Sequence, residues 1–179
     1  VILSGDNRIT VNGGVYYGIR VEGNLRINKT DSDTGDTLTI STGADTTGYS
    51  GSLVKANNTV MEGGTLNLSM LGADMSYIAV IGDFTLRGAA NLKSELAGDF
   101  NFNDTLYLES SGTTDILAVE GDSRYNMAVS ELAVRGSGPV SIETVNTKAK
   151  RAAIGFLREY TGTSKLTVMI GIHIKGCIN

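Results

Sequence analysis

Short runs in which apolar and polar residues alternate recur along the chain, and they limit its fold more than any other feature. The first set comprises Leu38-Thr39-Ile40, Leu66-Asn67-Leu68, Leu106-Tyr107-Leu108, Val140-Ser141-Ile142 and Leu166-Thr167-Val168. The second set comprises Ile19-Arg20-Val21, Ile78-Ala79-Val80 and Leu117-Ala118-Val119. A period of two residues is typical of β-strands with one apolar and one polar face. The pattern therefore predicts an all-β protein.

The runs also belong to a longer repeat. Residues 65–68 match residues 105–108 at an offset of 40, and residues 79–83 match residues 118–122 at an offset of 39. A repeat of about 40 residues corresponds to two solenoid turns of about 20 residues each, or to one propeller blade. Because a propeller needs several four-stranded blades, the solenoid is the better interpretation.

Glycine-containing turns follow the strands after a few residues, for example at Gly13-Gly14, Gly63-Gly64 and Gly82-Asp83. Glycine adopts the positive φ angles that tight corners need. In this respect residues 5–143 resemble the parallel β-helix proteins, or β-solenoids, of cell surfaces and adhesins. The resemblance implies a parallel β-helix, and a Greek-key β-sandwich is the alternative fold.

The repeats are clearest over residues 9–143, and residues 144–179 diverge from them within what we interpret as a single domain, residues 1–179. The divergent part contains apolar residues at helical spacing, namely Ala149, Ala152, Ala153, Phe156, Leu157 and Tyr160. This spacing predicts a short helix near residues 147–160. A buried strand through residues 153–157 is the alternative.

Composition and charge exclude two classes of interaction. The formal net charge is −4, and the densest basic cluster, residues 148–151, is too short to follow a nucleic-acid backbone. No apolar run reaches the roughly 18–20 residues of a membrane-spanning helix. The chain is rich in Gly, Thr, Ser, Asn and Asp, and it begins at Val1, which fits a removed leader or an excised segment. We therefore expect an extracellular or cell-surface location.

Several residues are candidates for covalent modification. Asn-X-Ser/Thr sequences place candidate glycosylation sites at Asn28, Asn57, Asn67 and Asn103. A chain so rich in Asn and Thr also contains such sequences by chance. Cys177 is the only cysteine, so it cannot form a disulfide within the chain. It is a candidate for a disulfide between two chains, or simply a small apolar residue.

One loop contains the only dense carboxylate cluster of the sequence. Asp31, Asp33 and Asp36 alternate with other residues in a glycine-containing loop. Such a loop can bring several oxygen atoms onto a hard cation such as calcium. The residue order differs from that of an EF-hand, and no glutamate stands at the closing position. Calcium binding and a solvated turn are therefore alternatives here, and no other cofactor is expected.

The sequence contains no recognisable catalytic apparatus. His173 is the only histidine, which excludes a multi-histidine metal site. Parallel β-helix enzymes that cleave polysaccharides gather aspartates on one outer face, and Asp83 and Asp122 occupy equivalent repeat positions. Both also stand in Gly-Asp turns, where aspartate is favoured without any chemistry. We expect no enzyme, with polysaccharide cleavage as the catalytic alternative.

The two ends are apolar and lack the polar caps of typical soluble solenoids. Their candidate assembly residues are Val1, Ile2, Leu3, Ile170, Ile172 and Ile174. Proline, a common guard of sheet edges, occurs once. These features predict a self-assembling structural subunit of an extracellular layer, sheath or filament, which joins copies of itself into an oligomer or polymer by strand pairing.

Two other functions fit the same features. A non-catalytic adhesin or carbohydrate-binding β-helix would take a polysaccharide as its partner, and a virion could use the chain as a structural protein. The adhesin predicts a stable monomer with saturable binding. The structural subunit predicts assembly that depends on concentration.

Overall fold

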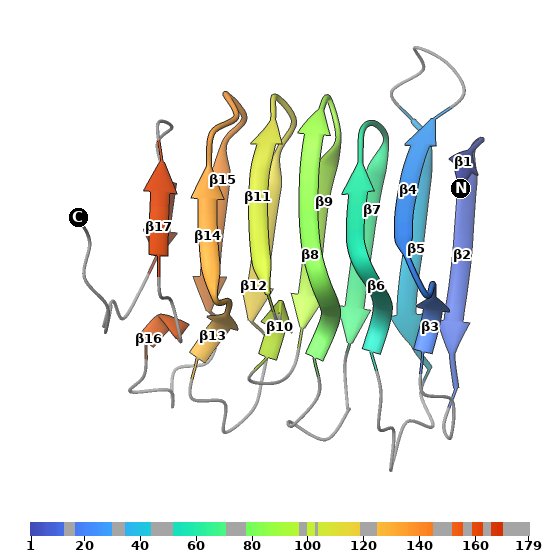
Figure 1. Ribbon diagram of the computed structural model, residues 1–179, viewed down its shortest axis with the longest axis horizontal. Coiled ribbons are helices and arrows are strands. Elements are labelled where there is room, and N and C mark those ends of the chain that lie inside the picture. Colours follow the sequence, from blue (N-terminus) through green and yellow to red (C-terminus); the bar gives the residue numbers. More distant parts are fainter. Residues whose placement is uncertain are drawn as a thin grey trace.

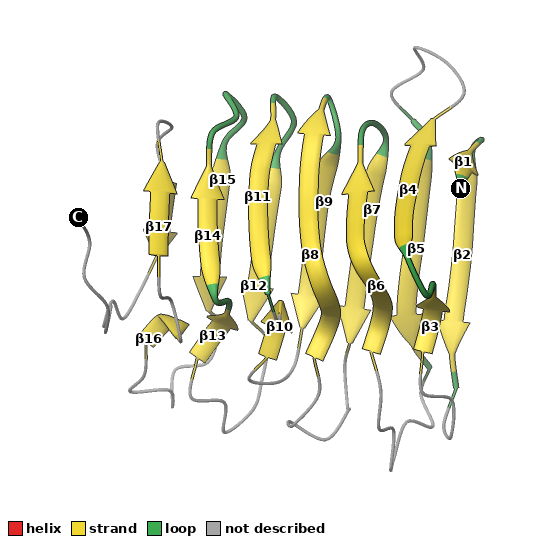
Figure 2. Cartoon of the chain, viewed as in Figure 1, coloured by secondary structure: helices red, strands yellow, loops and turns green. Residues whose placement is uncertain are grey.

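The computed structural model of the chain describes residues 1–12, 17–29, 35–43, 52–70, 78–96, 100–102, 104–118, 125–144, 152–155, 159–162 and 166–169. Within this part every regular element is a β-strand, as Figure 2 shows. The strands form two long sheets and a small third one. They lie side by side along the long axis of the molecule, with the strands of one long sheet behind those of the other (Figure 1).

One long sheet has seven strands. In spatial order they are β2 (Asp6–Val11), β5 (Thr37–Thr42), β7 (Thr65–Met70), β9 (Asn91–Leu96), β12 (Thr114–Ala118), β15 (Val140–Thr144) and β18 (Leu166–Met169). Every neighbouring pair in this sheet is parallel. Each turn of the chain, here called a rung, therefore adds one strand to the sheet.

The other long sheet has nine strands. Its main path is β1 (Ile2–Leu3), β4 (Asn24–Lys29), β6 (Ser52–Met61), β8 (Ile78–Gly88), β11 (Thr105–Ser110), β14 (Glu131–Val134) and β17 (Glu159–Gly162). Two short strands complete it: β3 (Tyr17–Arg20) beside β6, and β10 (Phe100–Phe102) beside β8. The small sheet pairs β13 (Tyr125–Ala128) with β16 (Ala152–Gly155).

These parallel ladders confirm the predicted β-solenoid. A Greek-key sandwich would require antiparallel neighbours, and the described pairs in both long sheets are parallel. The rungs are longer than the predicted length of about 20 residues. Thr65 pairs with Asn91, 26 residues later, and Leu92 pairs with Thr114, 22 residues later.

The helix predicted near residues 147–160 is wrong for the described residues of that segment. Residues 152–155 form β16, and residues 159–162 form β17. β16 pairs with β13 and β17 with β14. Parallel pairing satisfies the backbone of both short pieces, whereas a short helix interrupted by Gly155 would be marginal. The described residues contain no helix that is long and apolar enough to cross a membrane.

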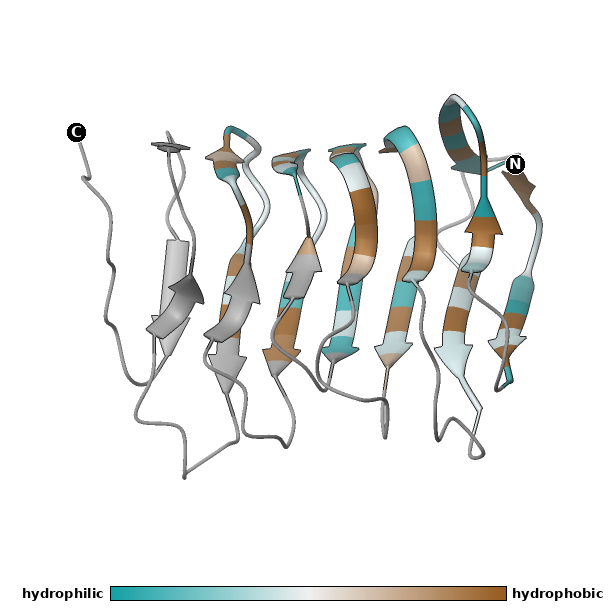
Figure 3. Cartoon of the chain, turned by 60° about the horizontal axis from the view of Figure 1, so that its bottom comes forward, coloured by the Kyte–Doolittle hydropathy of each residue, from teal (hydrophilic) through white to brown (hydrophobic). Residues whose placement is uncertain are grey.

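The hydrophobic core lies between the two long sheets, where side chains from successive rungs stack in register. Leu38 and Leu66 are paired neighbours in the seven-stranded sheet, and both are buried. From the nine-stranded sheet, Phe84 packs edge to face against Phe102 with ring centroids 5.8 Å apart. Each large buried side chain contributes about 1.5–3 kcal/mol. Figure 3 shows the alternation as bands of hydrophobic and hydrophilic residues along the strands.

Small residues form the tight corner between the two sheets. Gly64, Ala90, Gly112 and Gly138 occupy this corner in successive rungs. A Cβ atom on Gly112 would lie 2.3 Å from the carbonyl oxygen of Ala90, and one on Gly138 would lie 1.8 Å from that of Gly112. Because the backbones of neighbouring rungs approach so closely, these two positions have no room for a side chain.

Gly82 has a different place from the one that its sequence predicts. The Gly82-Asp83 pair lies inside β8 rather than in a turn after a strand. The φ angle of Gly82 is +96°, and the register between β6 and β8 shifts at Lys55 and Asn58. A glycine inside a strand permits such a local bend. The bend lets β8 continue as one long strand.

Candidate functional site

The outer edge of β2 is the first candidate surface. The carbonyl oxygens of Gly5 and Val11 accept hydrogen bonds from the N–H groups of Thr37 and Gly43, at 3.0 and 2.9 Å. Successive residues of a strand direct their backbone groups to opposite sides. The groups on the side away from β5 belong to Asp6, Arg8 and Thr10. No described strand pairs with this side of β2, so its backbone donors and acceptors form an open edge.

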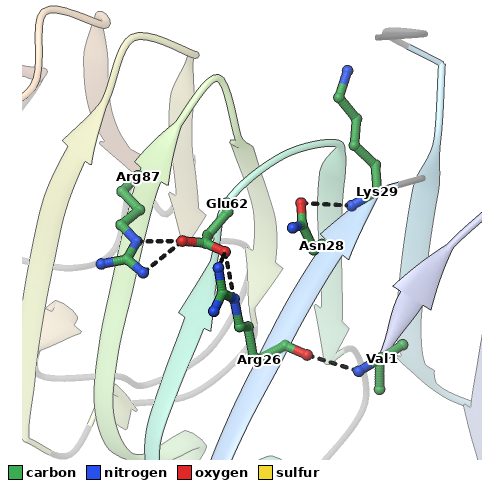
Figure 4. A network of polar contacts seen from close by, with 6 residues as sticks. All are labelled: Val1, Arg26, Asn28, Lys29, Glu62 and Arg87. Carbon is green, nitrogen blue, oxygen red and sulfur yellow. Dashed lines mark hydrogen bonds and ion pairs between the residues drawn. The ribbon is translucent and has the colours of Figure 1, made fainter. Parts of the chain in front are cut away.

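The predicted assembly residues near this edge divide into two kinds. Val1 and Ile2 are 59% and 70% exposed, whereas Leu3 is 1% exposed and belongs to the core. The backbone of Val1 is held by β4, because its ammonium group donates to the carbonyl oxygen of Arg26 at 2.8 Å (Figure 4). Of the assembly candidates that the structure describes, only Val1 and Ile2 therefore expose apolar side chains. The other assembly candidates, Ile170, Ile172 and Ile174, lie outside the described residues.

Asp36 has a structural contact that its sequence context did not reveal. Its side chain is buried, and Oδ1 accepts a hydrogen bond from the N–H of Gly5 at 2.6 Å. It thus ties the corner of one rung to the preceding rung. Asp31 and Asp33 lie outside the described residues, within which no cluster of three metal-ligating side chains occurs. Calcium binding in this loop stays a prediction.

The candidate glycosylation sites differ in accessibility. Asn57 is exposed, whereas Asn28 and Asn67 are half-buried. The Asn28 side-chain oxygen accepts from the N–H of Lys29 at 2.9 Å, and Asn67 donates to the Thr39 hydroxyl at 3.3 Å. Asn57 is therefore the described candidate that is best placed for modification. Asn103 and Cys177 lie outside the described part of the chain.

Of the two aspartates weighed for catalysis, the structure describes only Asp83. The Asp83 carboxylate accepts a hydrogen bond from the N–H of Thr105 at 3.1 Å, which links two neighbouring rungs. Its predicted equivalent, Asp122, lies outside the described residues, as does His173. The contact of Asp83 gives this residue a structural role.

A charged ladder, which the sequence pattern does not reveal, crosses the outer surface of the nine-stranded sheet. Glu62 lies between Arg26 and Arg87 and forms ion pairs with both (Figure 4). The Glu62–Arg87 hydrogen bond from Nε to Oε1 is 2.8 Å long. Glu109 and Arg135 form a further pair at 3.7 Å. The partners are separated by about one rung of sequence, so only knowledge of the rung length could have revealed them.

The arginines change the acidity of Glu62. Burial raises the pKa of its carboxyl group, but hydrogen bonds from Arg87 and Arg26 and the positive charge of both outweigh that effect. The pKa of Glu62 is therefore held below its ordinary value. The carboxylate is therefore ionised at neutral pH, and from the position directly after β6 it links β4 to β8.

A second missed cluster joins β3 to β6. The guanidinium carbon of Arg20 lies 5.4 Å from the centroid of the Tyr17 ring, and Lys55 Nζ lies 5.1 Å from it. Lys55 Nζ also donates to the Tyr17 hydroxyl at 3.5 Å. Glu22 forms an ion pair with Arg20. The signal in the sequence was weak, because Tyr17 and Lys55 are 38 positions apart.

A hollow of about 400 Å³ lies on the outer face of the seven-stranded sheet. Its polar lining includes Lys93, Glu95, Asp115 and Ser141 on β9, β12 and β15. The hollow thus presents both signs of charge. It differs in this respect from the cluster at Tyr17, where two cations meet one ring.

Comparison with known proteins gives no match: no protein-family model, no curated protein and no solved structure matches the chain.

Proposed function

We propose that this protein is a structural β-solenoid subunit of an extracellular layer, sheath or filament, and that copies of it join through the edge of β2. The observation that carries the proposal is the open side of β2, with the backbone groups of Asp6, Arg8 and Thr10 directed away from β5. An unpaired strand edge is a template for pairing with another chain. β2 contains neither a proline nor a bulge that would block such pairing.

The rungs of the solenoid show how an added strand would be held. Each internal strand of the seven-stranded sheet has a parallel neighbour on both sides. A strand added at β2 would make the same ladder on its free side. Val1 and Ile2, which precede β2 in the chain, expose further apolar surface. Backbone hydrogen bonds would hold the added strand, and contacts between the alternating side chains along the edge would fix its register.

Thr10→Pro tests this function. The N–H of Thr10 faces away from β5, so proline removes a donor of the open edge without removing a hydrogen bond inside the subunit. We expect the unmodified chain to form tubes, sheets or fibres as its concentration rises, and Thr10→Pro to remain as single particles. Negative-stain electron microscopy and sedimentation velocity measure the difference.

Thr10→Val is the matched control, because it keeps the N–H while removing the hydroxyl. It should assemble like the unmodified chain, and all three proteins should have the same far-ultraviolet circular dichroism. Assembly of Thr10→Pro at the same concentration as Thr10→Val would contradict pairing through β2. Single particles of the unmodified chain at every concentration would contradict the proposed function as a whole.

A further inference from the structure

The cluster of Tyr17, Arg20 and Lys55 places two like charges side by side. Arg20 of β3 and Lys55 of β6 are paired neighbours in the ladder. Like charges in neighbouring positions of a sheet are destabilising. Both cations approach the ring of Tyr17, and at an exposed site such contacts are too weak to offset the repulsion fully.

Carboxylates neutralise this cluster only in part. Glu22 accepts a hydrogen bond from Arg20 Nε at 2.8 Å, but the side chains of Arg20 and Glu22 are 54% and 78% exposed. An ion pair so open to solvent contributes little and is readily exchanged. Among the described ion pairs none includes Lys55. Within the described part of the chain, the cluster therefore retains positive charge that no carboxylate fully compensates.

We propose that Tyr17, Arg20 and Lys55 form a binding site for an oxyanion, namely a carboxylate or sulfate group. Arg20 exchanges Glu22 for the ligand and donates two parallel N–H groups to it. Lys55 supplies a second charge. The Tyr17 oxygen accepts a hydrogen bond from Lys55, so its hydroxyl hydrogen is free to point at the anion.

The size and charge of the cluster define the class of ligand. Two cations are too few to follow the phosphate backbone of a nucleic acid. An isolated carboxylate or sulfate fits. It can arrive as a free anion or on an acidic polysaccharide, in which case the Tyr17 ring also offers an apolar contact to the sugar. Arg20 and Lys55 belong to β3 and β6 of the nine-stranded sheet, whereas the open side of β2 belongs to the seven-stranded sheet.

The experiment measures binding by isothermal titration calorimetry, with sodium sulfate, dextran sulfate and uncharged dextran as separate probes. For the full chain we expect binding to one or both sulfated probes and none to dextran. Binding to dextran sulfate alone identifies the polysaccharide as the source of the group. Equal affinity per sulfate for both probes identifies the free anion.

Two variants test whether this cluster binds the sulfated probes. Lys55→Gln should weaken binding about tenfold or more, the loss expected for a hydrogen bond to a charged group. Arg135→Gln is the control, because Arg135 also lies over a tyrosine ring, Tyr107, at 5.8 Å, but without a second cation. The affinity of Arg135→Gln for the sulfated probes should equal that of the unmodified chain. Absence of binding by the folded full chain, equal affinities of Lys55→Gln and the full chain, or an equal loss in Arg135→Gln would overturn the proposal.

Discussion

At the scale of single residues, two buried serines show that the effect of a hydroxyl group on stability depends on whether it has a hydrogen-bond partner. Ser94 is 1% exposed and stands in the core between Leu68 and Ile116, and no described group bonds with its Oγ. Ser110 is 4% exposed, and its Oγ donates to the Ala90 carbonyl at 2.6 Å and accepts from the Gly112 N–H at 2.9 Å. The Ser94 hydroxyl is removed from water without gaining a hydrogen bond, whereas the Ser110 hydroxyl bonds with two backbone groups of the corner.

Replacing each serine with alanine should therefore act in opposite directions. Ser94→Ala removes an uncompensated polar group, and we expect the free energy of unfolding to rise by about 1 kcal/mol. Ser110→Ala leaves two buried backbone groups without their partner, and we expect a loss of about 1–3 kcal/mol. Urea denaturation measures both. An equal loss in the two variants would mean that Ser94 has a bonding partner.

At the scale of elements, the distance between neighbouring rungs at the corner limits which residues can join the two sheets. The corner residues of successive rungs lie in register, and the carbonyl of one rung faces the Cα of the next. Glycine is therefore required at position 112 because a side chain has no space there, and not because the backbone adopts a positive φ angle. Positive φ angles occur at other described glycines of the turns, such as Gly64 and Gly88.

Gly112→Ala tests this steric limit. The new Cβ would lie 2.3 Å from the Ala90 carbonyl oxygen, so the backbone must shift, and we expect a loss of about 1–3 kcal/mol in the free energy of unfolding. Gly23→Ala makes the same chemical change where nothing lies within 4 Å of the added atom. It should be neutral or slightly stabilising. Equal losses in the two variants, measured by urea denaturation, would refute the steric explanation.

At the scale of the whole molecule, charged side chains link rungs along the outer surface. Glu62 joins Arg26 and Arg87 across three strands, and Glu109 lies beside both Arg87 and Arg135 in the ladder. A solenoid is stabilised by contacts between neighbouring rungs. Pairs of opposite charge at the same height favour the observed register over a shifted one.

The lowered pKa of Glu62 predicts a dependence of stability on pH. Because the folded-state value lies below the unfolded-state value, the ionised carboxylate stabilises the fold at neutral pH, and the contribution is lost as pH falls through the folded-state pKa. The chain should melt at a higher temperature than Glu62→Gln near pH 7. The difference should shrink as pH falls through the folded-state pKa of Glu62, and high salt should reduce it.

Glu22→Gln is the control for the pH experiment. Glu22 also pairs with an arginine, but its side chain is 78% exposed, whereas that of Glu62 is 18% exposed. Its replacement should change the melting temperature little at any pH. If the melting temperature of Glu62→Gln differs from that of the unmodified chain by the same amount at every pH, the charge of Glu62 is not the cause of the stabilisation.

The alternation of apolar and polar residues was sufficient to predict much of the fold, because a period of two is a local property. It identified the all-β class, and the runs at residues 38–40, 66–68, 140–142 and 166–168 do lie at one height of the seven-stranded sheet. The run at residues 106–108 has the same pattern but lies in the other sheet. Local patterns do not tell one face of a solenoid from another.

The tertiary structure alone decided the length of each rung and therefore which distant residues meet. The offset of about 40 in the sequence aligned β7 with β11, which lie in different sheets, so it could not indicate that Glu62 lies beside Arg87 or that Lys55 lies beside Arg20. Rung length depends on loops and bends such as that at Gly82, whose cost is balanced by packing over the whole core. Strand identity is thus a matter of local periodicity, whereas register is a property of the assembled sheets.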